Sequence, residues 1–376
     1  MAKATLTIKL KRSFVAPAPA PNPPTISISA SSFGFMSTKL GTISTAQTYQ
    51  VSGINLIAPI LITTGPGYIV NTDGSNTNMS PISLAPTLGS VAATTIYVKF
   101  IPNNYSTFST VISNNSTGAI TASVHCIGTG TVEPVLVTWW NSLTTKPNGS
   151  VMVAFQKMFK QITDDGNLDK LDLFHFFGKL TAMDQFLKPI ISTSGQSFAP
   201  SSTGTVNYSP SGLSFSGAFF NLKWKPYTNA VAYAQKDATI GVYSFSNIDE
   251  NSVDIGCNDA VTSTYMKTLY SGNQSAVVNH ASVVSNANAS SKGFFAAKIE
   301  AGGAIKLTQN GTTTTIGITG SAADVNLDVY LGARNNNGSA ADLSTRVFEC
   351  VFIGGNIDIA LLYNAVLACA TELGVN

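Results

Sequence analysis

The chain has 376 residues, of which 11% are charged and 44% hydrophobic, and its 21 basic and 19 acidic residues give a formal net charge of +2. Ser, Thr, Asn or Gly interrupts every apolar run before it reaches the roughly 18 to 20 residues of a membrane-spanning helix, so we do not expect a transmembrane protein. The 20 Phe, 12 Tyr and 3 Trp residues exclude a disordered chain, and the scattered basic residues form no stripe for nucleic acid. A chain of this length is expected to form two domains.

Residues 1–24 are predicted to form an N-terminal arm and a spacer. Leu6, Ile8 and Leu10 alternate with Thr and Lys, which predicts a short strand with one apolar face. Residues 16–24 read APAPAPNPP, which is typical of extended polyproline II. Two interpretations stand side by side: a frayed terminus, or an arm that adds a strand to a neighbouring subunit or a partner protein.

The cysteines and the N-terminus both bear on the compartment. The first residues alternate and contain no unbroken apolar stretch, so they do not read as a secretory signal. The cysteines show neither a CxxC motif nor framework spacing, and we expect small buried hydrophobic residues rather than disulfides or metal ligands. They are Cys126, Cys257, Cys350 and Cys369. We therefore expect a protein that is made and assembled in a reducing cytoplasm.

Residues 25–131 are predicted to form an antiparallel β-sandwich. Short alternating segments are separated by turn signals such as Gly65-Pro66-Gly67 and Asp73-Gly74, at the spacing typical of sandwiches. The predicted strands begin at Thr25, Thr48, Ala58, Thr94, Ser109 and Ala119. The pattern predicts a domain of about a hundred residues.

Residues 132–190 are predicted to form a short helical connector. Apolar residues between Val151 and Ile162 recur at helical spacing, and Asp164-Asp165 should end that helix. A buried strand is predicted over residues 171–177, and a short helical turn over residues 181–187. Trp139 and Trp140 would anchor the connector against one sandwich.

Residues 191–376 are predicted to form a second, larger all-β domain that ends in a helix. Strand-like segments run from residue 196 to residue 355, and Asn310-Gly311 predicts a hairpin with a type I′ turn. Asp358 is the expected N-cap of a final helix with the sequence IALLYNAVLACATEL. That helix is apolar on most sides, so it should be buried against the sandwich or against another subunit.

The residue types that catalyse reactions are not arranged for catalysis. Glycoside hydrolysis requires two carboxylates facing one cleft, about 5 to 9.5 Å apart. None of the glutamates has a suitable strand spacing, and the adjacent Asp249 and Glu250 would point to opposite faces or share a turn. The glutamates are Glu133, Glu250, Glu300, Glu349 and Glu372. We predict a protein that is not an enzyme and has no cofactor.

The histidines and aspartates raise the question of a metal ion. His125, His175 and His280 lie on separate predicted strands and are interpreted as satisfied core or surface residues. A calcium ion at the rim of the second domain is the less favoured alternative to ordinary turn chemistry. Its ligands would come from Asp254, Asp259, Asp324, Asp328 and Asp342, with Asn335 to Asn337 adding side-chain oxygens.

A glycan site is predicted in the stretch KWKPYTNAVAY. Aromatic faces and amide groups suit sugar rings and hydroxyls, and the candidate residues are Trp224, Tyr227, Asn229 and Tyr233. The alternative, which we favour at this stage, is that these aromatic residues pack at a subunit interface.

Both predicted domains resemble known modules. In the first, residues 33–34 (FG), 49–53 (YQVSG), 96–102 (IYVKFIP) and 124–130 (VHCIGTG) resemble the immunoglobulin-like modules of Bacteroidetes proteins and their phages. The second resembles a concanavalin-like jelly roll of the laminin-G type, found in phage fibre, tail and head-decoration proteins. The matching stretches are residues 170–174 (KLDLF), 237–243 (DATIGVY), 310–311 (NG), 330–336 (YLGARNN) and 351–354 (VFIG).

The resemblance implies a non-enzymatic structural component of a bacteriophage virion, of the head-fibre, decoration or tail-fibre type. We expect a homo-oligomer, a trimer or a dimer, that contacts other virion proteins and host cell-surface glycans but neither nucleic acid nor membrane. The alternatives are a bacterial surface adhesin or glycan-binding protein, and a tail-associated depolymerase, which the missing carboxylate pair disfavours. Independently of the resemblance, the scarcity of charge predicts a chain that packs into an assembly.

Overall fold

The computed structural model describes residues 22–35, 37–259, 261–301, 303–318 and 324–375. It is an all-β fold with a few helices, and it divides into two compact units. The first unit comprises the residues up to Gly34, Thr45–Lys99 and Ser109–Cys126, and the second comprises Phe35–Ser44, Phe100–Phe108 and the chain from Ile127 onward. The strand predicted around Leu6 to Leu10 lies outside the described residues.

The strands of the N-terminal sandwich form two sheets. One sheet has the order β1-β4-β8-β6, and the other has the order β2-β10-β9-β5-β7, with β3 added parallel to β10. Their bounds are β1 Thr25–Ile28, β2 Ser32–Gly34, β3 Thr38–Lys39, β4 Gln47–Ile54, β5 Ile60–Thr63, β6 Tyr68–Asn71, β7 Ile82–Leu84, β8 Val91–Phe100, β9 Thr107–Asn115 and β10 Ala122–Thr131. Each of the six predicted strands is present.

Alternation along these strands places apolar side chains between the two sheets. In β4, Tyr49 and Val51 are buried while Gln50 between them is exposed. The hydroxyl of the buried Tyr49 donates to Asn114 Oδ1 at 2.9 Å, which satisfies both polar groups across the sandwich. The first unit therefore has a core of its own.

The second unit is a jelly-roll sandwich of two larger sheets. One has the order β12-β11-β28-β17-β22-β23-β24, with the β14-β15 hairpin attached to β28; the other has the order β13-β16-β25-β18-β19-β20-β21, with β26 and β27 beside β18. The strands of the first of these sheets are β11 Leu171–Phe176, β12 Ile191–Ser192, β14 Thr205–Ser209, β15 Gly212–Ser216, β17 Ala238–Ser244, β22 Gly293–Ile299, β23 Ala304–Gln309, β24 Thr312–Gly317 and β28 Val347–Gly354. Those of the second are β13 Ala199–Pro200, β16 Phe220–Asn221, β18 Ile255–Asn258, β19 Ser263–Tyr270, β20 Asn273–His280, β21 Val284–Ala287, β25 Tyr330–Leu331, β26 Arg334–Asn336 and β27 Ser339–Ala341.

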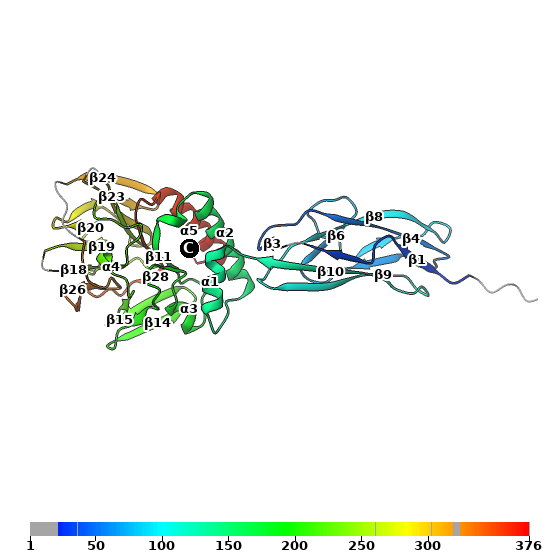
Figure 1. The fold of residues 1–376 in the computed structure, drawn as a ribbon, viewed down its shortest axis with the longest axis horizontal. Helices are drawn as coiled ribbons and strands as arrows, with labels where there is room; N and C mark the ends of the chain where they lie inside the picture. Colours follow the sequence, from blue (N-terminus) through cyan, green and yellow to red (C-terminus); the bar gives the residue numbers. More distant parts are fainter. Residues whose placement is uncertain (1–21, 36, 260, 302, 319–323, 376) are drawn as a thin grey trace, which may run out of the picture. The chain divides into compact units, whose positions relative to one another are not determined.

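The helices belong to this second unit. Figure 1 shows α2 and α5 lying together beside the sheet that contains β11 and β28. Edge-to-face ring contacts join them to that sheet: Phe159 of α2 meets Phe174 at 5.3 Å, and Tyr363 of α5 meets Phe294 at 5.5 Å. The helices are α1 Pro134–Ser142, α2 Gly149–Asp164, the 3₁₀ turn η1 Leu168–Lys170, α3 Met183–Leu187, α4 Pro226–Asn229 and α5 Ile359–Leu373.

The end signals read from the sequence are present at α5 and at the predicted hairpin. Asp358 accepts hydrogen bonds from the backbone of Ala360 and Leu361, and Gly374 ends the helix in the left-handed conformation. Asn310 and Gly311 both have positive φ between β23 and β24, as a type I′ turn requires. The predicted N-cap and hairpin are confirmed.

Two predicted features differ in detail. Residues 325–333 lie within the strand-like region predicted from residue 196 to residue 355, but only Tyr330–Leu331 forms a strand there, because the backbone of Val325 and Val329 bonds to the loop that contains Trp224 and Tyr227. The strand predicted within the connector is β11, and it pairs with β28 inside one of the two jelly-roll sheets. Among the described residues, none of the helices is long and apolar enough to span a membrane.

Candidate functional site

The predicted glycan stretch forms a loop on the second unit, which we call the rim loop (residues 223–234). Asp172 of β11 is almost fully buried, and its carboxylate accepts hydrogen bonds from three successive backbone N–H groups. The donors are Val231 at 2.9 Å, Ala232 at 3.0 Å and Tyr233 at 2.6 Å. These charge-assisted bonds fix the backbone of the loop to the sheet that contains β11.

Trp224 and Tyr233 face the interior of the rim loop. Trp224 is fully buried, and its indole N–H donates to the hydroxyl of Thr193 at 2.9 Å. Tyr233 packs edge-to-face on Trp224 and donates its hydroxyl proton to Asn279 Oδ1 at 2.7 Å. Burial raises the pKa of Tyr233 well above its usual value, so the hydroxyl remains a donor. Both rings hold the loop in place and neither presents a face to a ligand.

Tyr227 and Asn229 lie at the outer side of the same loop. The Tyr227 side chain is 69% exposed, and its backbone N–H is bonded to Val325. Asn229 is partly buried, and its side-chain oxygen accepts from the backbone N–H of Lys225 at 2.9 Å. Of the four predicted residues, Tyr227 is therefore the one that offers an open aromatic surface. Val231, 80% exposed, lies on the same loop.

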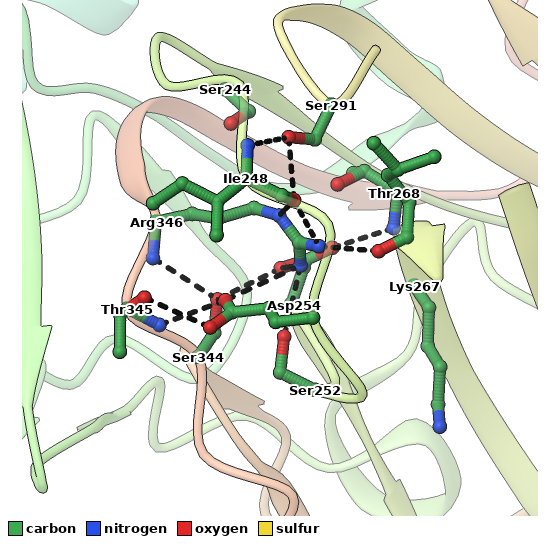
Figure 2. Close-up of polar contacts among 12 residues, drawn as sticks. Ser244, Ile248, Ser252, Asp254, Lys267, Thr268, Ser291, Ser344, Thr345 and Arg346 are labelled. Carbon is green, nitrogen blue, oxygen red and sulfur yellow. Dashed lines mark hydrogen bonds and ion pairs between the residues drawn. The ribbon is translucent and has the colours of Figure 1, made fainter. Parts of the chain in front are cut away.

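A buried polar network lies in another part of the second unit, around Arg346. Figure 2 shows its guanidinium enclosed by Ile248, Ser252, Asp254 and their neighbours. Nη1 donates to Asp254 at 2.7 Å and to Ser252 at 2.9 Å, Nε and Nη2 donate to the carbonyl of Ile248, and Nη2 also donates to the carbonyl of Leu269. All five donors of the guanidinium are used, so the network is a structural clamp.

The same network brings two carboxylates together that the sequence analysis did not pair. Glu250 lies 3.6 Å from Arg346 Nη1, and both Glu250 and Asp254 accept from the Ser344 hydroxyl. Burial alone would raise the pKa of Glu250, but hydrogen bonds from Thr345 and neighbouring serines lower it. Because Asp254 is fully buried and both carboxylates are ion-paired with Arg346, the two carboxylates do not face a substrate cleft.

The other glutamates, with one exception, form ion pairs with lysines. Glu133 pairs with Lys39, Glu300 with Lys306 at 2.8 Å and Lys298 at 3.3 Å, and Glu372 with Lys157 at 2.8 Å. The exception is Glu349 of β28: it is buried, and neither carboxylate oxygen has a hydrogen-bond partner among the described residues. Burial raises the pKa of Glu349 to about 8, so the group is protonated at neutral pH.

The predicted calcium ligands are engaged with protein donors. Asp254 pairs with Arg346 and Asp342 with Arg334 at 2.7 Å, while Asp328 accepts from Asn221 and Asp324 from Asn279, both at 2.8 Å. Asp259 accepts from the backbone of Val261 and Thr262, as in an ordinary turn, and Asn335 accepts from Gly338. In the part of the chain that the structure describes, three or more His, Cys, Asp or Glu side chains nowhere gather as metal ligands would.

The histidines have different environments. His125 is exposed on β10, and His280 Nδ1 accepts from the backbone of Ser282 at 2.9 Å. His175 of β11 is fully buried against the rings of Trp139, Phe177 and Phe198, and neither nitrogen has a hydrogen-bond partner among the described residues. His175 therefore departs from the interpretation as a satisfied histidine, because its ring packs against aromatic side chains and neither nitrogen has a hydrogen bond of normal geometry among the described residues. Burial lowers its pKa to about 3, against a smaller opposing effect of the Gln185 backbone.

The four cysteines are buried and free, as predicted. Burial raises the pKa of the Cys126 thiol to about 12 and raises those of the others as well. The thiols are therefore protonated at neutral pH and pack as small hydrophobic groups.

A cavity of about 470 Å³ lies at the start of α5, and Lys170, Lys298 and Lys306 line it. Lys298 is buried, and its ammonium group is bonded to Asn356, to the carbonyl of Ile357 and to Glu300. Lys306 shares Glu300. Internal acceptors thus already engage two of the three ammonium groups, and the cavity shows no built anion site.

No family model matches the chain, and no curated protein matches it. Among solved structures, it is similar to a sialidase CBM40 of Ruminococcus gnavus bound to alpha2,3 sialyllactose, with 14% identity, coverage of 35% of this chain and 83% of that one, and a TM-score of 0.29. It is also similar to domain 4 of AbnA, a GH43 extracellular arabinanase of Geobacillus stearothermophilus in complex with arabinotriose. The identity is 12%, the match covers 52% of this chain and 98% of that one, and the TM-score is 0.35. A third similar structure is the binding domain of botulinum neurotoxin serotype D, with 14% identity, coverage of 53% of this chain and 51% of that one, and a TM-score of 0.35. At these TM-scores the likenesses carry no inference about ligand or activity.

Proposed function

We propose that the chain is a non-enzymatic structural component of a bacteriophage virion, of the head-fibre, decoration or tail-fibre type, which works as a homo-oligomer. The observation that carries the proposal is the distribution of charge. In the described part of the first unit, Asp73 is the one acidic residue and Lys99 the one basic residue. Both are tied to one loop: Lys99 bonds to Gly74, Ser75 and Asn76, and Asp73 accepts from Ser75.

A β-sandwich surface with so little charge lacks the repulsion that keeps copies of a soluble protein apart. Ser, Thr and Asn cover it instead, and their short neutral side chains can pack against another protein without the cost of desolvating ions. The resemblance of both units to modules of phage structural proteins agrees with this reasoning. A bacterial surface adhesin is the alternative.

Mass spectrometry of purified particles tests the proposal directly. We expect the chain in particles at a constant ratio to the other virion proteins, and light scattering on the isolated chain should give an oligomer. If the chain is absent from particles and enriched in the cell-surface fraction, the adhesin alternative replaces the virion proposal. A chain that is monomeric and absent from particles contradicts the proposal altogether.

A second candidate function, contact with cell-surface glycans, is favoured by the rim loop. Asp172 and Thr193 hold the loop rigid, and Tyr227 presents an exposed ring on it. A fixed aromatic ring suits the stacking of a sugar, because little conformational entropy is lost on binding. Glycan-array binding that disappears in Tyr227→Ala but persists in Tyr270→Ala, a tyrosine 41% exposed on β19, would support this function. An array without a hit would remove it.

A further inference from the structure

A shallow groove of about 580 Å³ crosses one end of the first unit, and it is lined without any charged residue. Ile54, Leu84 and Ala92 contribute apolar surface, and serines, threonines and backbone fill the spaces between them. Ile54 is 57% exposed at the end of β4. We call this surface the end groove (residues 52–54, 83–85, 87, 90–92 and 94).

The turn beside the end groove exposes a leucine in a conformation that leucine rarely adopts. Thr87 and Ser90 pair across a two-residue turn, in which Leu88 has φ +53° and Gly89 has φ +77°. Leu88 is 100% exposed, and the neighbouring Ile57 is 75% exposed. A strained backbone that points a large apolar side chain into solvent does nothing for the stability of the isolated unit, and such outliers concentrate at binding sites.

The groove also borders an unpaired strand edge. β7 is the last strand of its sheet, since β5 pairs with one side of it and no described strand pairs with the other. Ser83 and Leu84 of β7 line the groove. An extended segment that enters the groove can therefore bond to the β7 backbone and place alternate side chains against the apolar lining.

We infer that the end groove binds the N-terminal residues 5–11 of a second copy of this chain as an added β-strand. Residues 1–21 lie outside the described part. By sequence, Leu6, Ile8 and Leu10 form one apolar face of the segment, with Thr5, Thr7, Lys9 and Lys11 on the other. The uncharged groove accepts the apolar face and leaves the lysines in solvent.

The position at which the described chain begins argues for a second copy rather than the same one. Thr25 pairs with Ile54, and the side chain of Asn55 donates to the carbonyl of Pro23, so the arm starts beside the groove. Residues 16–24 (APAPAPNPP) predict a polyproline II spacer of about 28 Å, at about 3.1 Å per residue. A spacer with that predicted length and stiffness would carry residues 5–11 away from their own groove and toward that of a neighbour.

Light scattering on the full-length chain tests the inference. We expect the wild type to self-associate, and two variants to be monomers: Ile8→Asp, which puts a charge on the apolar face of the arm, and Ala92→Arg, which puts one in the groove. Ala92 is exposed, so the arginine does not disturb the core. Ser109→Arg is the matched control, because it adds the same charge at an exposed position of the same unit, away from the groove; it should assemble like the wild type. A monomeric wild type, or an Ala92→Arg variant that assembles normally, overturns the inference.

A peptide experiment identifies the occupant. A synthetic peptide of residues 3–13 should bind the chain that lacks residues 1–15, and Ala92→Arg in that chain should weaken the binding roughly tenfold or more, because an arginine would be desolvated in the groove. A scrambled peptide of the same composition should not bind. Equal binding of both peptides, or no binding of either, contradicts the assignment.

This inference rests on the proposed function only in that both require copies of the chain to meet. The two can fail separately: particle mass spectrometry decides whether the protein belongs to a virion, and the groove variants decide how its copies join.

Discussion

Arg346 and Asp254 lie 2.7 Å apart, and both side chains are wholly buried in the second unit. Through this pair the loop that precedes β18, the strand β19 and the beginning of β28 are held together (Figure 2). A buried ion pair recovers in Coulomb energy roughly what its desolvation costs, so its presence says little about net stability. Loss of one partner is different, because the other charge then remains buried without a counterion.

We therefore predict that Arg346→Met destabilises the protein by about 3–5 kcal/mol, since Asp254 is left as an unpaired buried carboxylate. The double variant Arg346→Met with Asp254→Leu should recover a large part of that loss, because neither of the two fully buried charges then remains. Urea titration, followed through the unfolding transition of the second unit, measures the free energy of unfolding of both variants.

The exposed ion pair between Lys157 and Glu372, 2.8 Å apart, is the control. Lys157→Met should cost less than about 1 kcal/mol, because solvent screens that pair. A double variant less stable than Arg346→Met alone would contradict the view of Arg346 as the partner that compensates Asp254.

Glu349 should make the protein less stable as the pH rises. Its pKa in the fold is about 8, against an ordinary value of 4.5, so the folded protein holds a proton that the unfolded chain releases between those values. Within that window the contribution of Glu349 to the free energy of unfolding should fall with increasing pH, by at most about 1.4 kcal/mol per pH unit. Glu349→Gln removes the titrating group and should remove this decline.

The measurement is the free energy of unfolding at pH 5 and pH 8 for the wild type and for Glu349→Gln, compared as a difference of differences. Glu300→Gln is a suitable control, because bonding to Lys306 lowers the pKa of Glu300 and its contribution should be lost only in acid. Parallel pH profiles of the wild type and Glu349→Gln would show that the carboxyl is not buried as described.

His175 should act in the opposite direction, in acid. Its pKa is lowered from 6.5 to about 3, so the unfolded chain binds a proton below pH 6.5 that the fold does not. The contribution of His175 to stability is complete above pH 6.5 and should decline by at most about 1.4 kcal/mol per unit as the pH falls toward 3. In His175→Phe, which keeps an aromatic ring among Phe177 and Phe198, the acid-side decline should be shallower. Unfolding at pH 7 and pH 4.5 measures it, and His125→Phe, at an exposed position, should leave the slope unchanged.

The elements that the sequence predicted well are those set by local signals. The α5 helix has an almost continuous apolar sequence and an aspartate N-cap, and the β23-β24 turn has Asn310-Gly311; both can be read from a few neighbouring residues. The short strands β2, β3, β6 and β7 were not predicted, because they exist through pairing with distant partners rather than through their own composition.

The same distinction explains the sites. The position of the rim loop was predicted, but not which of its aromatic rings are buried. The loop backbone is held by Asp172, which lies about 60 residues earlier in the chain, and this distant contact helps to set which rings face inward. The clamp was missed for the same reason, since Arg346 and Asp254 are 92 residues apart and no local pattern links them.

Trp224 and Tyr227 should respond very differently to substitution, although they are three residues apart on one loop. Trp224 is fully buried and bonded to Thr193, so Trp224→Ala should leave a cavity and cost about 3–5 kcal/mol. Tyr227 is 69% exposed, so Tyr227→Ala should change the free energy of unfolding by less than about 0.5 kcal/mol. Thermal or urea unfolding measures the stability of Trp224→Ala and of Tyr227→Ala. Trp224→Phe, a milder change in the core, should have a stability between those of the two alanine variants. A loss of ligand binding in Trp224→Ala would therefore report a disturbed fold, whereas a loss in Tyr227→Ala, with stability unchanged, would report a contact. If Trp224→Ala is as stable as the wild type, the rim loop does not have the packing described.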